Sequence, residues 1–110
     1  MEKLDRYRDT IDKILTGYAQ WSTSDDVVAE KVIDQKKNHF EVVRFGWDGK
    51  RHIHGSILHL DIQNEKIWIQ YDGTNHPIAN ELEAAGVPKS DIVLGFISPE
   101  LRPHTGYAVG

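Results

Sequence analysis

The sequence predicts an α+β fold, in which an N-terminal helix packs on an antiparallel sheet of about four to five strands, followed by two short C-terminal helices and a tail. Three observations predict this fold. Apolar residues recur at helical spacing near the N-terminus, β-branched and aromatic runs separated by short turns fill the middle, and Pro and Gly residues divide the last third. A chain of 110 residues predicts a single domain over residues 1–110.

The N-terminal segment is predicted to form an amphipathic helix. Its apolar residues recur at intervals of about three or four positions, which places them on one side of a helix. The polar run 22–26 is expected to end the helix, and Gly17 indicates either fraying of the last turn or close packing. The apolar stripe consists of Leu4, Tyr7, Ile11, Ile14, Leu15 and Tyr18.

The middle of the chain is predicted to form consecutive strands joined by short turns. The strands are residues 27–35, 40–47, 52–63 and 66–71. The turns between them are residues 36–38, the dipeptide Asp48-Gly49 and Asn64. This order predicts an antiparallel meander with one face covered by the N-terminal helix.

The last third is divided by helix-start and helix-stop residues. Capping residues followed by Pro77 predict the start of a helix, and Gly86 predicts its end. A second short helix is predicted to contain Ile92 and Val93. The tail, residues 96–110, is expected to be ordered coil or a short edge strand.

The composition restricts the function. The chain has a formal net charge of -4, and because affinity for nucleic acid comes from neutralising phosphates, it is not expected to bind nucleic acid on its own. Direct DNA binding would have to use Arg44, Lys50 and Arg51. It contains no cysteine, which excludes disulfides, thiolate metal ligands and cysteine nucleophiles. No signal peptide and no apolar run of membrane-spanning length is recognised, so a cytoplasmic location without a membrane partner is expected. No cofactor is predicted.

His52 and His54 are the first candidates for chemistry. Strand alternation places both imidazoles on one face, a geometry that divalent metals use. The same alternation places His59 and Asp61 on the opposite face, unless a bulge at Gly55 changes the register. The pattern is compatible with a metal site, but surface histidines or an interface with a partner are the favoured interpretation.

The same segment supports an enzymatic alternative. A metal-dependent hydrolase or nuclease could use His52 and His54 with carboxylates such as Asp61 and Asp72. Ser56 lies within a strand rather than on the sharp turn that exposes a serine nucleophile. Because these side chains form no coherent catalytic set, no catalytic or metal-ligating residue is assigned.

The preferred interpretation is a docking surface. Most aromatic residues are expected in the core, but Trp68 alternates with polar residues and is a candidate for an exposed contact residue. The apolar tail around Tyr107 is expected either to pack on the sheet edge or, by preference, to insert into a partner. A homodimer is expected. The candidate interface residues are Arg51, His52, His54, Trp68, Gln70, Arg102 and Tyr107.

Three ordered blocks resemble a known family. They are GWDGKRHIHGSILHLDIQNEKIWIQYDGT, IANELEAAGVPKSDIVLGF and RPHTGYAV, and together with the N-terminal helix they cover nearly the whole chain. They resemble the XisI-like family, which is named fdxN element excision controlling factor and is found mainly in cyanobacteria. Two positions depart from the family pattern: Asn75 stands where members tend to have Glu, and Asn64-Glu65 stands where members tend to have Asp-Gly.

The resemblance implies a small α+β protein with a part in programmed excision of a DNA element during heterocyst differentiation. In that process a separate recombinase cuts and rejoins the DNA, and XisH and XisI proteins are accessory factors. XisH-like proteins resemble restriction-type nucleases, and their genes commonly adjoin those of XisI-like proteins. The resemblance therefore implies a XisH-like partner. No catalytic residues are established for the family, and none is transferred to this chain. We therefore expect a non-enzymatic protein that binds and controls a nuclease-like partner.

Overall fold

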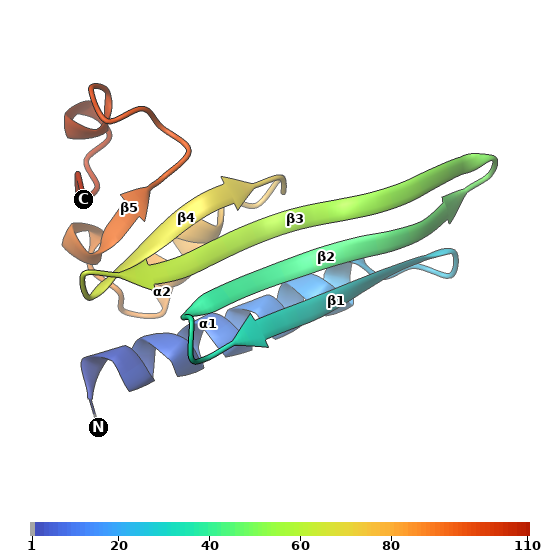
Figure 1. Ribbon diagram of the computed structural model, residues 1–110, viewed down its shortest axis with the longest axis horizontal. Helices are drawn as coiled ribbons and strands as arrows, with labels where there is room; N and C mark the ends of the chain where they lie inside the picture. The colour runs from blue at the N-terminus through green and yellow to red at the C-terminus, as the bar shows by residue number, and fades with distance from the viewer. Residues whose placement is uncertain (1) are drawn as a thin grey trace.

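The structure is a five-stranded sheet with helices on one face (Figure 1). The computed structural model describes residues 2–110. In chain order the elements are α1 (Lys3–Ser22), β1 (Val27–Asp34), β2 (His39–Asp48), β3 (Arg51–Gln63), β4 (Lys66–Asp72), α2 (Ile78–Ala84) and β5 (Ile92–Leu94), with short 3-10 helices at Lys89–Asp91 and Arg102–His104. No helix among these residues is long and apolar enough to cross a membrane.

The strands lie in the sheet in the order of the sequence. β1 to β4 pair antiparallel, as the short turns predict, and β5 pairs parallel with β4. α1 packs behind β1 and β2, and α2 lies on the same side, behind β3 and β4 (Figure 1). The predicted α+β fold, with the N-terminal helix on the sheet, is confirmed.

The core lies between the helices and the sheet. The predicted stripe on α1 is confirmed, since Tyr7, Ile11, Leu15 and Tyr18 are all buried. Buried residues alternate with more exposed ones along the strands, as expected when one face of an antiparallel sheet is covered. The strand and α2 residues of this core are Ala29, Phe40, Val42, Leu58, Leu60, Ile62, Ile67, Ile69, Ile78, Ala79, Leu82 and Ile92.

Two tyrosine hydroxyls hold α1 near both of its ends. Tyr7 donates a hydrogen bond to Asp91, which also pairs with Lys3 at 3.0 Å. Tyr18 donates to the carbonyl oxygen of His76 at 2.5 Å. Burial and the hydrogen bond with Asp91 raise the pKa of Tyr7 to about 12. Burial alone would raise the pKa of Asp91, but the hydrogen bonds from Tyr7 and Lys3 outweigh it and lower that pKa.

Gly17 plays neither of the roles expected from the sequence. The helix does not fray there, because α1 continues to Ser22. Gly17 is not closely packed either, because no heavy atom outside its own helix backbone lies within 4 Å of the position that a Cβ would take. The residue therefore leaves open space beside the helix.

The turns lie where the sequence predicts them. Gly49 has a φ of 62° at the first central position of the β2–β3 turn, which type II′ turns give to glycine. Asn64 and Glu65 have φ values of 53° and 62°, the two positive values of a type I′ turn. Gly46 is required by a close approach, since a Cβ there would lie 2.2 Å from the backbone oxygen of Asp26.

The C-terminal third departs from the prediction. The second helix is limited to the 3-10 turn Lys89–Asp91, and Ile92–Leu94 form β5. The helical prediction for Ile92 and Val93 is therefore wrong. A short apolar run is compatible with either a buried strand or a helix, and pairing with β4 makes this one a strand. The tail lies at the free edge of β5, where the N–H of Ala108 donates to the carbonyl of Ile92 at 2.8 Å. Of the two placements considered for the tail, packing on its own sheet edge is the one observed.

Candidate protein interface

The sheet face opposite the two helices is open across β1, β2 and β3 (Figure 1), and we call it the outer face. Strand register assigns its residues. They are Val28, Glu30, Val32 and Asp34 on β1, His39, Glu41, Val43, Phe45 and Trp47 on β2, His52, His54, Ser56, His59 and Asp61 on β3, and Trp68, Gln70 and Tyr71 on β4.

Large apolar side chains are exposed on the outer face. Trp47 is 56% exposed and Tyr71 is 50% exposed, and Val28, Val32 and Phe45 are exposed beside them. Grouped apolar side chains on a protein surface mark interaction sites. The expectation that most aromatic residues lie in the core is wrong for Trp21, Trp47, Tyr71 and Phe96.

A bulge in β3 decides which residues share this face. Val42 of β2 pairs with Leu58, but its neighbour Val43 pairs with Ser56, so Ile57 is an extra residue without a partner in the register. An extra residue reverses the inward and outward alternation of the strand on its two sides. Each side chain of β3 before Ile57 therefore points to the face opposite to the one that uninterrupted alternation would give it.

This bulge overturns the predicted separation of the histidines. His52 and His54 lie on the same face as His59 and Asp61, not on the opposite one. The sequence is compatible with a bulge at Gly55, but the extra residue is Ile57. The outer face consequently carries more polar side chains than strand alternation predicts.

One end of the outer face, which we call the aromatic end, consists of Phe45, Trp47, His52 and His54. The rings of Trp47 and His52 lie with their centroids 4.7 Å apart. His52 and His54 stack at 6.1 Å, and His54 lies opposite Phe45 in the register. The two candidate histidines thus extend an aromatic surface.

The other end, which we call the acidic end, consists of Asp34, His39, Glu41, His59 and Asp61. His39 Nε2 lies 2.6 Å from Glu41 Oε2, and the rings of His39 and His59 lie 4.4 Å apart. The hydrogen bond with His39 lowers the pKa of Glu41 and outweighs the opposite effect of partial burial. The Nε2 atom of His59 is shielded from solvent and has no hydrogen-bond partner among residues 2–110.

Trp68 is half-buried by the chain's own tail. The guanidinium of Arg102 lies 5.1 Å from the centre of the Trp68 ring, and Gly110 lies against the same ring. Arg102 Nε also donates to the carbonyl of Ile97 at 2.9 Å. Gln70, beside Trp68, donates to Asp61 at 3.3 Å. Two of the predicted interface residues, Trp68 and Arg102, therefore contact each other.

The remaining predicted interface residues lie elsewhere. Arg51 lies beside the β2–β3 turn, on the helix side of the sheet, and pairs with Asp48 at 3.7 Å. Tyr107 donates a hydrogen bond to Glu83 of α2 at 2.6 Å, and the Lys89 ammonium lies 5.6 Å from its ring. The predicted set is thus divided among the outer face, the hairpin turn and the α2 side.

The carboxylates proposed for a metal-dependent enzyme do not converge. Asp72 lies on the helix side, where it accepts hydrogen bonds from the backbone N–H groups of Thr74 at 2.9 Å and Ile78 at 2.8 Å. It therefore organises the start of α2 and is turned away from His52 and His54. Within residues 2–110, no group of three or more His, Asp or Glu side chains is placed to hold a metal ion.

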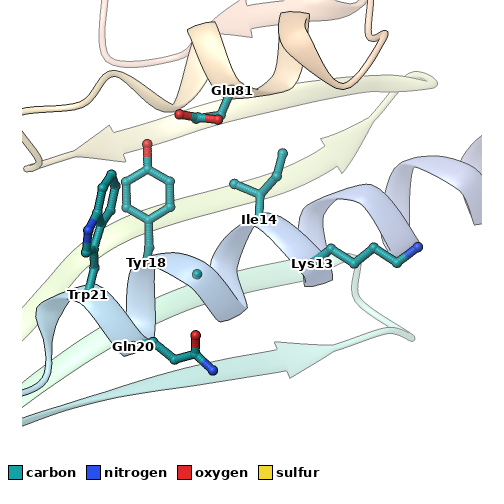
Figure 2. Close-up of a pocket in the computed structure, with 7 residues that line it drawn as sticks. Lys13, Ile14, Tyr18, Gln20, Trp21 and Glu81 are labelled. Carbon is teal, nitrogen blue, oxygen red and sulfur yellow. The ribbon is translucent and has the colours of Figure 1, made fainter.

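A second surface, the groove between α1 and α2, lies on the helix side (Figure 2). Figure 2 shows that Ile14, Tyr18 and Trp21 point from α1 toward α2, while Lys13 points away. The carboxylate of Glu81 faces them from α2. The groove has a volume of about 540 Å³ and is lined by Lys13, Ile14, Gly17, Tyr18, Gln20, Trp21 and Glu81. The sequence alone does not predict this groove.

The fold and the two surfaces define a small α+β protein with a helix-covered sheet and exposed aromatic side chains on both of its sides. A family model described as XisI protein matches residues 1–109. The crystal structure of a XisI-like protein from Anabaena variabilis has a TM-score of 0.90 and 37% identity, over 97% of this chain and 99% of that one. The crystal structure of the fdxN element excision controlling factor XisI from Anabaena variabilis has a TM-score of 0.85 and 41% sequence identity, over 99% of this chain and 100% of that one. No curated protein matches the chain.

The chain belongs to the XisI family. The resemblance inferred from three sequence blocks is confirmed over nearly the whole chain. Both structural relatives come from a cyanobacterium, in agreement with the expected distribution of the family.

Proposed function

We propose that this protein is a non-enzymatic accessory factor in the programmed excision of a DNA element, and that it acts in the cytoplasm by binding a XisH-like, nuclease-related protein. Family membership and 41% identity to a protein named fdxN element excision controlling factor support the role in excision. The observation that carries the binding mode is exposed aromatic surface on both sides of the molecule, with Trp47 on the outer face and Trp21 beside the groove. Tryptophan is enriched among the residues that dominate the energy of protein interfaces.

The charge of the chain supports a basic partner. The formal net charge is -4, and three carboxylates, Asp34, Glu41 and Asp61, lie together at the acidic end. A nuclease-related protein presents a basic surface to DNA, and an acidic factor is steered toward such a surface. The factor would then compete with DNA for the partner, and the complex should weaken as the salt concentration rises.

We further propose that the protein without its partner is a homodimer that pairs through the outer face, and that the XisH-like partner displaces the second copy to reach the acidic end. Strands of about ten residues, three abreast at about 4.8 Å spacing, give an open face of roughly 500 Å² per copy, or about 1,000 Å² in total, which is the size of a weak interface. A two-fold axis that crosses the strands near Val43 and Ser56 lays the aromatic end of one copy over the acidic end of the other. Imidazole N–H groups then meet carboxylates, so the face is complementary to itself, as a two-fold interface requires.

Co-expression with a XisH-like protein encoded beside this gene tests the proposed function. We expect the two proteins to co-purify at low salt and to separate as salt is raised, while the isolated protein leaves DNA unshifted in a gel at physiological salt. Absence of a complex at every salt concentration, or tight DNA binding by the isolated protein, would contradict the proposal.

A further inference from the structure

We propose that the groove between α1 and α2 binds an arginine side chain presented by a protein partner. That this partner is the XisH-like protein rests on the proposed function, whereas the preference for arginine rests on the lining of the groove alone. Three features of the described residues support the preference for arginine. They are the exposed aromatic ring of Trp21, the Glu81 carboxylate without an ion-pair partner, and the open space beside Gly17.

The platform is Trp21, which at 63% exposure is the most exposed large apolar side chain of the described residues. His76 stacks on its ring at 4.6 Å with an angle of 26°, and Tyr18 meets it edge-on at 5.6 Å. These contacts hold the indole in one orientation and leave much of its surface exposed to the groove. A guanidinium stacks well on such a platform, because it is planar and more weakly hydrated than an ammonium.

The carboxylate is that of Glu81, which faces the rings in Figure 2. Burial and then the charge of Glu81 raise the pKa of Tyr18 to about 12, in agreement with a carboxylate close to this phenol. Within residues 2–110 the Glu81 carboxylate has no ion-pair partner. Lys13, the cation that lines the groove, pairs with Asp9 at 2.9 Å instead. An arginine that enters the groove could pair with Glu81 through two parallel hydrogen bonds.

The glycine is Gly17, which lies within α1 and lines the groove. Glycine is unfavourable in a helix interior, and no packing within the described chain explains it, because the space around its Cβ position is open. A larger side chain at this position would project into the groove. The unfavourable residue is explained if the open space receives a group from another molecule.

The same protein already contains an arginine stacked on a tryptophan. Arg102 lies over Trp68 at 5.1 Å and donates hydrogen bonds to the backbone carbonyls of Ile97 and Gly95. Trp21 has a comparable indole ring with the Glu81 carboxylate in the same groove, whereas Arg102 lies over Trp68. The groove therefore has the acceptor groups for an arginine that its own chain does not supply.

Titration with the blocked tripeptide Gly-Arg-Gly, followed by NMR of the indole N–H groups, tests the proposal. We expect the Trp21 resonance to shift in a saturable way in the millimolar range, with binding several-fold weaker for Gly-Lys-Gly and absent for Gly-Ala-Gly. Trp47, exposed on the other side of the molecule, is the internal control and should not shift. No saturable shift, or an equal response to all three peptides, would overturn the proposal.

Two variants separate recognition from folding. Glu81→Gln keeps the shape of the groove and should weaken Gly-Arg-Gly binding by about tenfold, since it removes the charge. Gly17→Gln should raise the unfolding temperature and still weaken binding, a combination that misfolding cannot produce. Unchanged binding in both variants would overturn the proposal. Because this assay contains no partner protein, its failure leaves the proposed function standing, and failure of co-purification leaves the arginine site standing.

Discussion

The outer face and the groove between α1 and α2 expose tryptophan in different ways. The outer face is broad, draws on several strands, and distributes apolar, imidazole and carboxylate groups along its length. The groove is narrow, is built from two helices, and sets one carboxylate against one aromatic platform. A broad face gains affinity from the area that it buries against a complementary surface. A narrow groove instead recognises a single side chain. The two surfaces are therefore expected to bind their partners through different kinds of contact.

The two surfaces also depend on different parts of the fold. The outer face depends on strand register, because the bulge at Ile57 turns His52 and His54 onto it. The groove depends on the position of α1, which is held by the hydroxyls of Tyr7 and Tyr18. A change in one surface should therefore leave the other intact.

Insertion of one alanine after Ile57 has the largest expected effect on this comparison. One more residue in β3 would shift the part of the strand before the bulge by one position, turn His52 and His54 to the helix side and separate His52 from Trp47. We expect a loss of roughly 2–4 kcal/mol in the free energy of unfolding and loss of the homodimer. Urea unfolding and light scattering measure both effects. If the insertion variant stays folded, its Trp21 should still respond to Gly-Arg-Gly; a full-strength homodimer in this variant would contradict the role of the register in forming the outer face.

Substitution of Phe45 by Lys is expected to disrupt the homodimer without unfolding the monomer, because Phe45 is already 37% exposed. A charge buried within the apolar part of an interface should raise the dimer dissociation constant by about 100-fold or more. Sedimentation or light scattering over a concentration series measures this change. Trp21→Ser removes a more exposed aromatic residue from the helix side, and loss of the dimer in this control would contradict the assignment to the outer face.

Glu41 allows a pH test of the acidic end. Its pKa is lower in the folded protein than the ordinary value of 4.5, so the folded state favours the ionised carboxylate. This stabilisation is complete above pH 4.5 and is lost as the pH falls through the lower folded value. Glu41→Gln should remove this part of the acid sensitivity, an effect of about 1 kcal/mol or less in unfolding free energy. Glu100→Gln is the control, and identical pH profiles for Glu41→Gln and the parent protein would contradict the prediction.

The smallest expected effect is that of Glu65→Gly in the β3–β4 turn. Glu65 has a φ of 62°, which a glycine adopts without strain. We expect a gain of about 0.5–1 kcal/mol in unfolding free energy, with dimer formation and Gly-Arg-Gly binding unchanged. A change in either binding property would show that the two surfaces are less independent than we infer.

Much of the fold could be predicted from the sequence because the local signals agree with one another. The stripe from Tyr7 to Tyr18, the turn at Gly49 and the turn at Asn64 all lie where the pattern places them. The bulge was not located, because Ile57 is an ordinary strand residue and only its partners across the sheet reveal it as extra. The three residues of β5 carry too short an apolar run to distinguish a strand from a helix.

The candidate sites were harder to predict than the fold. His52 and His54 were correctly placed together, but the residues that share their face depend on the register. The groove joins Trp21 with Glu81, which are far apart in the sequence, and only the packing of α2 beside α1 brings them together. Its local signals were Gly17 inside a helical pattern and Trp21 outside the buried stripe. Each signal alone is compatible with an ordinary surface helix.

The two edges of the sheet suggest how assembly of this protein would end. The tail covers part of the β5 edge through Ala108, and β1, at the other edge, carries Glu30, Lys31 and Asp34. A covered edge and a charged edge both oppose the addition of further strands. Copies could then associate only face to face, and each copy has one such face. Association would stop at a closed pair instead of growing by strand addition into a fibre.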